Sequence, residues 1–395
     1  MHMNNPYEIL PGVFYVGVND RTKHRFEGLW PLPLGVSYNS YLVKGEKTAL
    51  IDTVDAAYTD IFLQNIRACL GGRRLDYLVV NHMEPDHSAS IAAVRREWPE
   101  IKIVGNAKTL SMIEGYYGLN EGTHRVDEGD TISIGPTLRF YMIPMVHWPE
   151  TMVTYCPELK AVFSGDAFGC FGAIDGGITD EEMNTDRYWD EMIRYYSNIV
   201  GKYGVPVQNA LKKVSGLEIS AVCSTHGPVW KRNIGRVVDI YDRLSRYEAE
   251  PGAVVAYGSM YGNTAQMAEH IARQLAVRGV RNIVVHDLSH SHESYVLRDV
   301  FKYNTLVIGG PTYNGGMFPP VEALTSAIES RCIPHRNFGC FGSFTWAGAC
   351  VRKLTEFAAR MKWEVTAGPL EMKQGATSEK LAAAAGFAEA LTARM

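Results

Sequence analysis

The chain has 395 residues, of which 46% are hydrophobic and 21% charged, and its formal net charge is −4. This composition is ordinary for a soluble globular protein, and the length predicts two or three domains rather than one. The small negative charge gives no support for a nucleic-acid partner or for binding to an anionic membrane surface. The sequence also lacks an apolar run long enough to span a bilayer and lacks a signal-peptide core, so we expect no membrane association.

Cysteine usage excludes several kinds of site. The seven cysteines are an odd number, and no two of them form a C-x-x-C pair. This pattern argues against a disulfide framework, a thiolate zinc finger and a rubredoxin-type iron centre. Together with the absence of a signal peptide, it predicts a cytoplasmic protein.

The first part of the chain, up to about residue 250, consists of short predicted strands separated by turns. Acidic residues and histidines recur where these strands end, which is where an α/β sandwich presents its loops. The polar segment 246-RYEAEPG-252 ends in Pro-Gly and predicts a domain boundary near residue 250. The predicted strands are 12–18, 39–54, 76–82, 101–107 and 138–147, and the clearest predicted helices lie in 60–70 and 186–213.

After this boundary, short apolar strands alternate with helices. The run 253–279 predicts a buried strand, then a loop rich in Gly, Ser, Asn and Thr, and then an amphipathic helix. This alternation predicts a doubly wound parallel sheet. Further strand–helix units begin at 282–290, 304–316, 337–346 and 363–373, and an alanine-rich helix is expected over roughly 378–394.

A dense group of metal-ligand side chains lies in 81-NHMEPDHSAS-90, which reads His82-x-Glu84-x-Asp86-His87. Imidazole suits Zn, Fe, Cu and Ni, and a carboxylate adds a hard oxygen that can bridge two cations. The motif alone leaves open a zinc site with a changed ligand at Glu84 or a site for a different metal. Three more ligand candidates follow apolar strands at intervals of 60, 19 and 60 residues, and these are His147, Asp166 and His226.

A phosphate-binding loop is predicted at 258-GSMYGNTAQMA-268, between a strand and a helix. Hydroxyl and amide groups of the loop and the free N–H groups of the helix N-terminus suit an anion. The loop is neither G-x-G-x-x-G nor G-x-x-x-x-G-K-[ST], and it contains no lysine, which favours a monophosphate such as FMN. Alone, such a loop is more often an ordinary turn with a helix cap. Two later loops with aromatic residues, 311–319 and 342–349, strengthen the ligand interpretation.

The ordered pattern H-x-[HE]-x-D-H, then H, D and H, is similar to that of the metallo-β-lactamase fold. The version with Glu84, joined to a flavodoxin-like domain, resembles the flavodiiron proteins. This resemblance covers the whole chain. It implies a metallo-β-lactamase-like αβ/βα sandwich over 1–250 that binds two irons, and a flavodoxin-like domain over 251–395 that binds FMN.

The resemblance also implies a ligand assignment. One iron would be bound by His82, Glu84, His147 and Asp166, and the other by Asp86, His87, His226 and Asp166, with Asp166 bridging. A single histidine at a strand end more often has a structural role, but seven matched positions are far harder to obtain by coincidence. Three carboxylates and four histidines favour iron over zinc, although affinity alone still ranks zinc above Fe(II).

For the flavin, the resemblance implies three loops. The phosphate would be bound by Ser259, Met260, Tyr261, Gly262, Asn263 and Thr264. The ring would be enclosed by Pro311, Thr312, Tyr313, Asn314, Gly315 and Gly316 and by Ser343, Phe344, Thr345, Trp346, Ala347 and Gly348. Tyr313 and Trp346 are the aromatic side chains expected to flank the ring.

The implied activity is the reduction of O₂ to water, of NO to N₂O, or of both, with electrons relayed through FMN. The sequence extends only through the flavodoxin-like part, so the donor is expected to be a separate carrier such as rubredoxin. A head-to-tail homodimer, alone or paired as a dimer of dimers, would bring one subunit's flavin to the other's irons, with Trp148 as a contact to the partner flavin. His24, Tyr195 and Tyr196 are candidates for hydrogen bonding near the ligands.

Two alternatives remain open from the sequence. The first is a zinc hydrolase of the metallo-β-lactamase type with an accessory flavin domain. The second is a non-catalytic electron carrier with a vestigial metal domain. The preference between O₂ and NO is not decided by these residues.

Overall fold

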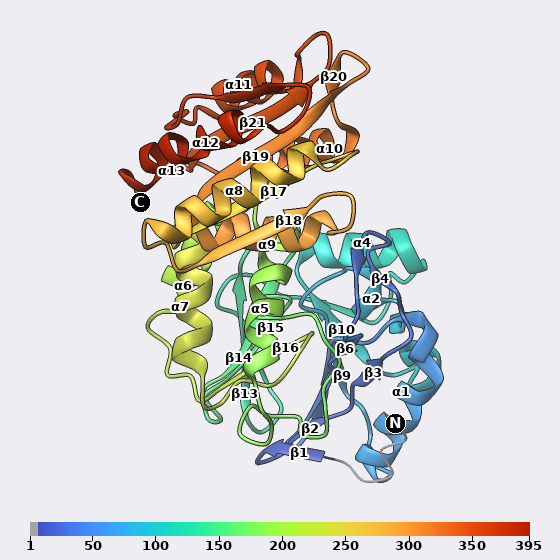
Figure 1. Ribbon diagram of the computed structural model, residues 1–395. Coiled ribbons are helices and arrows are strands. Elements are labelled where there is room, and N and C mark those ends of the chain that lie inside the picture. Colours follow the sequence, from blue (N-terminus) through green and yellow to red (C-terminus); the bar gives the residue numbers. More distant parts are fainter. Residues whose placement is uncertain (1–6) are drawn as a thin grey trace. The chain divides into compact units, whose positions relative to one another are not determined.

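The computed structural model describes residues 7–395, and the chain divides into two compact units after Ser245 (Figure 1). This division lies close to the boundary predicted at residue 250, while the assignment of functional domains to 1–250 and 251–395 stays a prediction. Pro251 and Gly252, which suggested the boundary, lie inside strand β17 (Glu250–Tyr257). Proline is tolerated there because the beginning of a strand does not need every ladder N–H.

Unit 1 is built on two sheets packed face to face. Alternate residues such as Ile51, Phe140 and Phe163 point inward and form one core between the sheets. The first sheet has the order β1 (Tyr7–Leu10), β2 (Val13–Tyr15), β7 (Tyr41–Lys44), β8 (Thr48–Ile51), β9 (Tyr77–Val79), β10 (Lys102–Gly105) and β11 (Thr123–Arg125). The second has the order β12 (Thr131–Ser133), β13 (Thr137–Met142), β14 (Met152–Cys156), β15 (Ala161–Gly165) and β16 (Ala221–Ser224).

Helices cover the outer sides of these sheets and complete the predicted αβ/βα sandwich. The helices α1 (Thr59–Leu70) and α4 (Ala107–Tyr117) lie beside the first sheet, and α6 (Gly204–Val214) and α7 (Ile234–Ser245) lie beside the second (Figure 1). Within residues 7–395, no helix has both the length and the apolar character that crossing a membrane requires.

The segment 186–213 is not one helix. It consists of α5 (Asp186–Tyr195), a π-helical turn η2 (Tyr196–Val200) and α6. Gly201 and Gly204 weaken helix propagation here, and Pro206 fits only the first turn of a new helix.

Unit 2 is a doubly wound parallel sheet. Its strands run in the order β18 (Ile283–Asp287), β17, β19 (Tyr303–Tyr313), β21 (Asn337–Phe344) and β22 (Leu370–Lys373), with a short antiparallel strand β20 (Gly316–Met317) on β19. In chain order this path is 2-1-3-4-5, the flavodoxin arrangement. Its helices are α8 (Asn263–Val277), α9 (Glu293–Lys302), α10 (Pro319–Ser330), α11 (Cys350–Met361), α12 (Ser378–Ala382) and α13 (Ala384–Thr392).

The core of unit 2 gathers around Phe341 on β21. Phe341 is fully buried, and its ring lies against Gly309 of β19, where any Cβ would stand 2.2 Å from the ring. Side chains of α8 and α13, including Ile271 and Phe387, close the same cluster. Because β17, β19, β21 and β22 are parallel neighbours, their carboxyl ends meet at one edge of the sheet.

We expect Phe341→Ala to lower the unfolding free energy of unit 2 by roughly 3–5 kcal/mol, because it removes a large buried ring and leaves a cavity. Denaturation of the full-length protein, followed by circular dichroism and by flavin release, measures this. The control is Val277→Ala on α8, where the side chain is 63% exposed and a change within about 0.5 kcal/mol is expected. Equal losses in the two variants would contradict this account of the core.

Candidate metal and flavin sites

The seven predicted ligand residues lie where strands of both sheets of unit 1 end. His82 follows β9, Asp166 follows β15 directly, and His226 follows β16. The strands β8 and β9 are parallel neighbours, as are β15 and β16, so their carboxyl ends lie at common edges. The loop between β13 and β14 adds His147, and the short helix α2 (Pro85–Ser88) with its preceding residue adds Glu84, Asp86 and His87.

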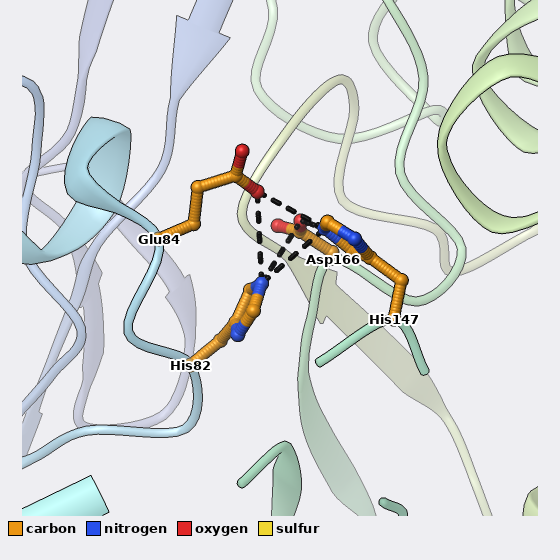
Figure 2. Close-up of side chains that lie close together, drawn as sticks. All are labelled: His82, Glu84, His147 and Asp166. Carbon is orange, nitrogen blue, oxygen red and sulfur yellow. Dashed lines mark hydrogen bonds and ion pairs between the residues drawn. The ribbon is translucent and has the colours of Figure 1, made fainter. Parts of the chain in front are cut away.

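One group of four contains His82, Glu84, His147 and Asp166, all buried, and one ligand atom from each lies within 4.8 Å of the others (Figure 2). His147 Nε2 is 3.0 Å from Glu84 Oε2 and 3.2 Å from Asp166 Oδ2. His82 Nε2 is 3.6 Å from each of the same two oxygens. Metal–nitrogen and metal–oxygen bonds of about 2.0–2.2 Å produce ligand–ligand separations of this size.

The second group contains Asp86, His87 and His226. His226 Nε2 lies 3.2 Å from Asp86 Oδ2, and His87 Nε2 lies 3.5 Å from Asp86 Oδ1. Asp166 joins the two groups, because its other oxygen, Oδ1, is 3.0 Å from His87 Nε2 and 3.5 Å from His226 Nε2. One carboxylate thus presents one oxygen to each group, which is the arrangement of a bridging ligand.

The chemistry of these donors fits two cations. Both oxygens of Asp86 and the Nε2 atoms of His87 and His226 are buried and have no hydrogen-bond partner among the described residues. Burying such atoms without a partner is unfavourable, so their convergence is explained best by a metal ion. The mixture of imidazole and carboxylate donors suits iron.

The pKa values of the residues in this cluster depend on the contacts between its carboxylates and its imidazoles. Burial alone would lower the pKa of His147, but hydrogen bonds to Asp166 and Glu84 raise it to about 9. Burial acts on His226 in the same way, and the close carboxylates of Asp166 and Asp86 raise its pKa to about 10. Burial would raise the pKa of Asp166, but the nearby imidazoles, His87 first, hold it well below its usual range. Without a cation, protons on the histidines therefore balance the buried carboxylates.

Several groups form hydrogen bonds to the ligand residues and so hold them in place from behind the metal site. These groups were not identified from the sequence. Glu150 Oε1 accepts a hydrogen bond from His82 Nδ1 at 2.6 Å, and the carbonyl of Ser37 accepts one from His226 Nδ1 at 2.8 Å. Thr225 donates through Oγ1 to Asp166 Oδ1 at 2.6 Å. Such partners fix the orientation of the ligand and the nitrogen that faces the metal. In the sequence, only the position of Glu150 three residues after His147 could have suggested that it lies near the ligands.

The four aromatic residues that were predicted to lie around the ligands differ in how close they come to them. Tyr195 is fully buried, its ring centroid is 5.7 Å from that of His226, and its hydroxyl has no hydrogen-bond partner among the described residues. Tyr196 packs against Tyr241 instead, at 5.0 Å. His24 is exposed. Trp148 lies edge-on to His82, with ring centroids 5.3 Å apart.

A cavity of about 400 Å³ opens beside the first group of ligands. Glu84 and Asp86 form part of its wall, together with Lys23, Glu27 and Asp55. Burial and then the charge of Glu84 raise the pKa of Glu27 to about 7, although Trp30 Nε1 donates a hydrogen bond to this carboxylate at 2.9 Å. Charged side chains and apolar ones such as Phe26 thus line a cavity that reaches two of the ligand residues.

Unit 2 contains a second cavity, of about 630 Å³, at the carboxyl edge of its sheet. This is the position where doubly wound folds bind ligands, and the volume is in the range of small-molecule sites. In the wall of this cavity, the hydroxyl oxygens of Thr264, in the first turn of α8, and Ser343, at the end of β21, lie 2.8 Å apart. Exposed aromatic side chains surround it, with Tyr261 90% and Trp346 87% exposed, which leaves apolar area for a planar ring.

Most residues predicted to contact the flavin line this cavity. Gly262, Gly316 and Gly348 do not, and Gln374 and Gly375, which sequence reasoning missed, do. Gly262 has φ 88° and precedes α8, so its role is to turn the chain. Gln374 follows β22, the least distinctive strand in the sequence. The predicted contacts in the lining are Ser259, Met260, Tyr261, Asn263, Thr264, Pro311, Thr312, Tyr313, Asn314, Gly315, Ser343, Phe344, Thr345, Trp346 and Ala347.

Comparisons with known proteins agree with this two-part architecture. Residues 36–227 match the family model of ODP family beta lactamases, and residues 255–386 match that of flavodoxins. The chain is 31% identical to the anaerobic nitric oxide reductase flavorubredoxin of Shigella dysenteriae, over 87% of this chain and 73% of that protein. Among solved structures, it is similar to rubredoxin oxygen:oxidoreductase from Desulfovibrio gigas (TM-score 0.92, 27% identity, 98% and 99% of the two chains). It is also similar to the flavodiiron protein from Giardia intestinalis (TM-score 0.93, 28% identity, 98% and 97%).

We expect metal binding to release protons at pH 7.5, because His147 and His226 then carry protons that a metal must displace. Titration of the metal-free protein with Zn²⁺ in two buffers of different ionisation enthalpy measures this release. The pKa values of both histidines are raised above 6.5 in the folded chain, so their stabilising contribution is complete below about pH 6.5 and is lost as pH rises through about 9–10. The metal-free protein should therefore lose thermal stability over that interval. Zn²⁺ binding without proton release would contradict this assignment.

Proposed function

Because the chain belongs to the flavodiiron protein family, we propose that it reduces O₂ to water, NO to N₂O, or both, at two irons supplied with electrons through FMN. The reduction of O₂ to two waters takes four electrons and four protons, and the reduction of two NO molecules to N₂O and water takes two of each. The relatives in the comparison include a nitric oxide reductase and an oxygen oxidoreductase. Both activities therefore belong to the proposal.

The observation that carries this function is the shared carboxylate of Asp166. It faces His147 through one oxygen and His87 through the other, at 3.2 and 3.0 Å. We propose that the ligands of one iron are His82, Glu84, His147 and Asp166, and that those of the other are Asp86, His87, His226 and Asp166. Bound there, the irons would supply reversible one-electron chemistry and Lewis acidity.

The residues of this chain would then hold and surround the reactants. Glu27 is placed at the cavity that reaches Glu84, and Tyr195 lies beside His226, so these two are our candidates for hydrogen bonding to the reactants. Glu27 would exchange protons with water in the cavity, whereas burial raises the pKa of the Tyr195 hydroxyl well above its usual value, so Tyr195 would donate a hydrogen bond and keep its proton. His24 is exposed, and Tyr196 contacts Tyr241, so neither has a comparable position.

For FMN, we propose that the first turn of α8 and its preceding loop bind the phosphate. The hydroxyl groups of Ser259 and Thr264 line the cavity there, and the helix N-terminus favours an anion. Tyr313 and Trp346 would lie along the ring. An external electron carrier of the rubredoxin type is the proposed donor.

We further propose a head-to-tail homodimer in which Trp148 contacts the flavin of the partner subunit, and a cytoplasmic location. Trp148 lies edge-on to His82, with ring centroids 5.3 Å apart, so a flavin against this tryptophan would lie close to the proposed irons, which supports the pairing. The iron-binding and flavin-binding domains are assigned to residues 1–250 and 251–395.

The function is tested by anaerobic turnover with NO beside aerobic turnover with O₂, using one competent donor and analysing N₂O and H₂O₂. Iron, zinc and flavin contents are measured on the same preparation. About two irons and one FMN per chain, with turnover of at least one gas, are expected. Two zincs with esterase activity would instead support the hydrolase alternative, and slow reoxidation by both gases would support a non-catalytic carrier.

We expect Glu84→Ala to weaken binding of one iron and to abolish turnover, because it removes the carboxylate that faces His147 at 3.0 Å. FMN content should not change, since the flavin cavity is formed within unit 2. Metal analysis, absorption spectra and steady-state assays measure these effects. Loss of FMN together with iron would show that the two units do not bind their cofactors independently.

The reciprocal variant is Thr264→Val, which keeps the shape of the side chain and removes its hydroxyl. A loss of one charge-assisted hydrogen bond to phosphate corresponds to roughly 1.5–3 kcal/mol, or about 10–150-fold weaker FMN binding. Fluorescence titration of the flavin-free protein measures the affinity. Two irons should remain bound, and an unchanged FMN affinity would exclude this threonine from the phosphate site.

A further inference from the structure

The proposed ligand sets of the two irons are formally equal. Each iron receives two histidines and one unshared carboxylate, Glu84 in the first half-site (His82, Glu84, His147) and Asp86 in the second half-site (Asp86, His87, His226). The carboxylate of Asp166 is shared. The donor types alone therefore predict no electronic difference between the half-sites, but groups that hydrogen-bond to the ligands can create one.

The first such group is Glu150, which lies behind the first half-site. Its Oε1 is 2.6 Å from His82 Nδ1, and it also accepts the backbone N–H of Met83 at 2.9 Å. The side chains of His82 and Glu150 are both 0% exposed. A buried carboxylate at this distance makes the imidazole a stronger electron donor.

The second half-site has a neutral acceptor in the corresponding place. His226 Nδ1 is 2.8 Å from the backbone carbonyl of Ser37. A carbonyl has no net charge, so His226 gains less donor strength than His82. The first half-site thus has one additional full negative charge in hydrogen-bond contact with a ligand.

The bridging carboxylate is also unequal at its two ends. Asp166 Oδ1, which faces His87 and His226, accepts a hydrogen bond from Thr225 Oγ1 at 2.6 Å. Asp166 Oδ2, which faces His147 and His82, has no hydroxyl donor among the contacts of the described residues. A donor to Oδ1 withdraws electron density from the oxygen that serves the second half-site.

Two other acids lie close to the cluster. Asp52 accepts hydrogen bonds from the backbone N–H and from Nδ2 of Asn81, at 2.7 and 3.0 Å, and makes no hydrogen bond with either half-site among the described contacts. Its charge interacts with His87 of the second half-site and with His82 of the first, so it does not favour one half-site alone. Glu27 lies beside Glu84 on the first half-site, so its contribution has to be measured separately.

We propose that Glu150 and Thr225 make the two half-sites unequal, so that the iron held by His82, Glu84 and His147 is oxidised first and the iron held by Asp86, His87 and His226 remains ferrous longer. This inference rests on the proposed diiron function. Negative charge stabilises Fe(III), so Glu150 lowers the potential of the first iron, while Thr225 raises that of the second. In one-electron oxidation of the iron-loaded diferrous protein, the electron would leave the first half-site and reduce the external oxidant, here ferricyanide.

The test is a redox titration of the protein loaded with iron and FMN, with the mixed-valence state quantified by electron paramagnetic resonance. The wild type is compared with Glu150→Gln and Thr225→Val, which keep side-chain shape. Glu150→Gln should raise the lower of the two iron potentials, and Thr225→Val should lower the upper one. The comproportionation constant is the equilibrium constant for forming two mixed-valence clusters from one diferrous and one diferric cluster. Each substitution brings the two iron potentials closer together and so reduces this constant, by about tenfold for a change of about 59 mV in their difference.

A larger comproportionation constant in either variant would overturn the proposal, because it would place the first oxidation at the second half-site. An unchanged constant in both variants would overturn it as well. Thr225→Ser keeps the hydroxyl and should behave as the wild type, and Glu27→Gln measures the contribution of Glu27. If Glu150→Gln fails to retain two irons, the pair Thr225→Val and Thr225→Ser decides alone.

Failure of the proposed function is distinguishable from failure of this inference. Wild-type protein that does not bind two irons, or that reduces neither gas, refutes the function itself. Wild-type protein that binds two irons and turns over, but whose variants shift in the opposite sense, refutes only the order of oxidation.

Discussion

The contact between the Asp166 carboxylate and histidines of both half-sites is the constraint on which unit 1 depends. Asp166 is fully buried, and each of its oxygens faces two imidazole nitrogens at 3.0–3.6 Å. A buried carboxylate is tolerated only with compensating positive charge, supplied by cations or by protonated histidines. His147 comes from the β13–β14 loop of the second sheet, and His87 comes from α2, which follows β9 of the first sheet. The attraction between Asp166 and these histidines therefore also links the two sheets of the sandwich.

The ligand residues could be proposed from the sequence because each of them follows an apolar strand, and parallel strands of one sheet end at a common edge. The groups behind them could not. Glu150 and His82 are 68 positions apart, and the acceptor for His226 is a backbone carbonyl, at Ser37, that has no residue-type signature. Thr225 directly precedes His226, but nothing in the sequence distinguishes it from an ordinary loop threonine. Only the structure shows that its hydroxyl oxygen lies 2.6 Å from Asp166 Oδ1. Hydrogen bonds of this kind depend on tertiary geometry rather than on spacing.

The fold follows the same division. The alternation of strands and helices predicted a doubly wound parallel sheet in unit 2, and the observed order 2-1-3-4-5 agrees with the flavodoxin-like resemblance. The two-sheet sandwich of unit 1 was implied by the resemblance to the metallo-β-lactamase fold, and its apolar strands form the observed core. The sequence misled where local propensity and tertiary packing disagree. Segment 186–213 was predicted as helical but divides at η2 and Gly201, and Pro251 lies within a strand rather than in a linker. Gln374 could not be predicted as part of the flavin cavity because β22 has only four residues and little apolar pattern.

Charge balance connects the buried cluster to its solvent-facing side. The carboxylates of Glu84, Asp86, Asp166 and Glu150 add up to −4, and two ferrous ions add +4, so the diferrous cluster with neutral histidines has no net charge. Removing electrons would leave uncompensated positive charge in a buried site, which is unfavourable unless protons leave or anions enter. The cavity lined by Lys23, Glu27 and Asp55 reaches Glu84 and Asp86 and gives that compensation a route from solvent. With the proposed irons bound, electron and proton movement would therefore be coupled through these buried carboxylates.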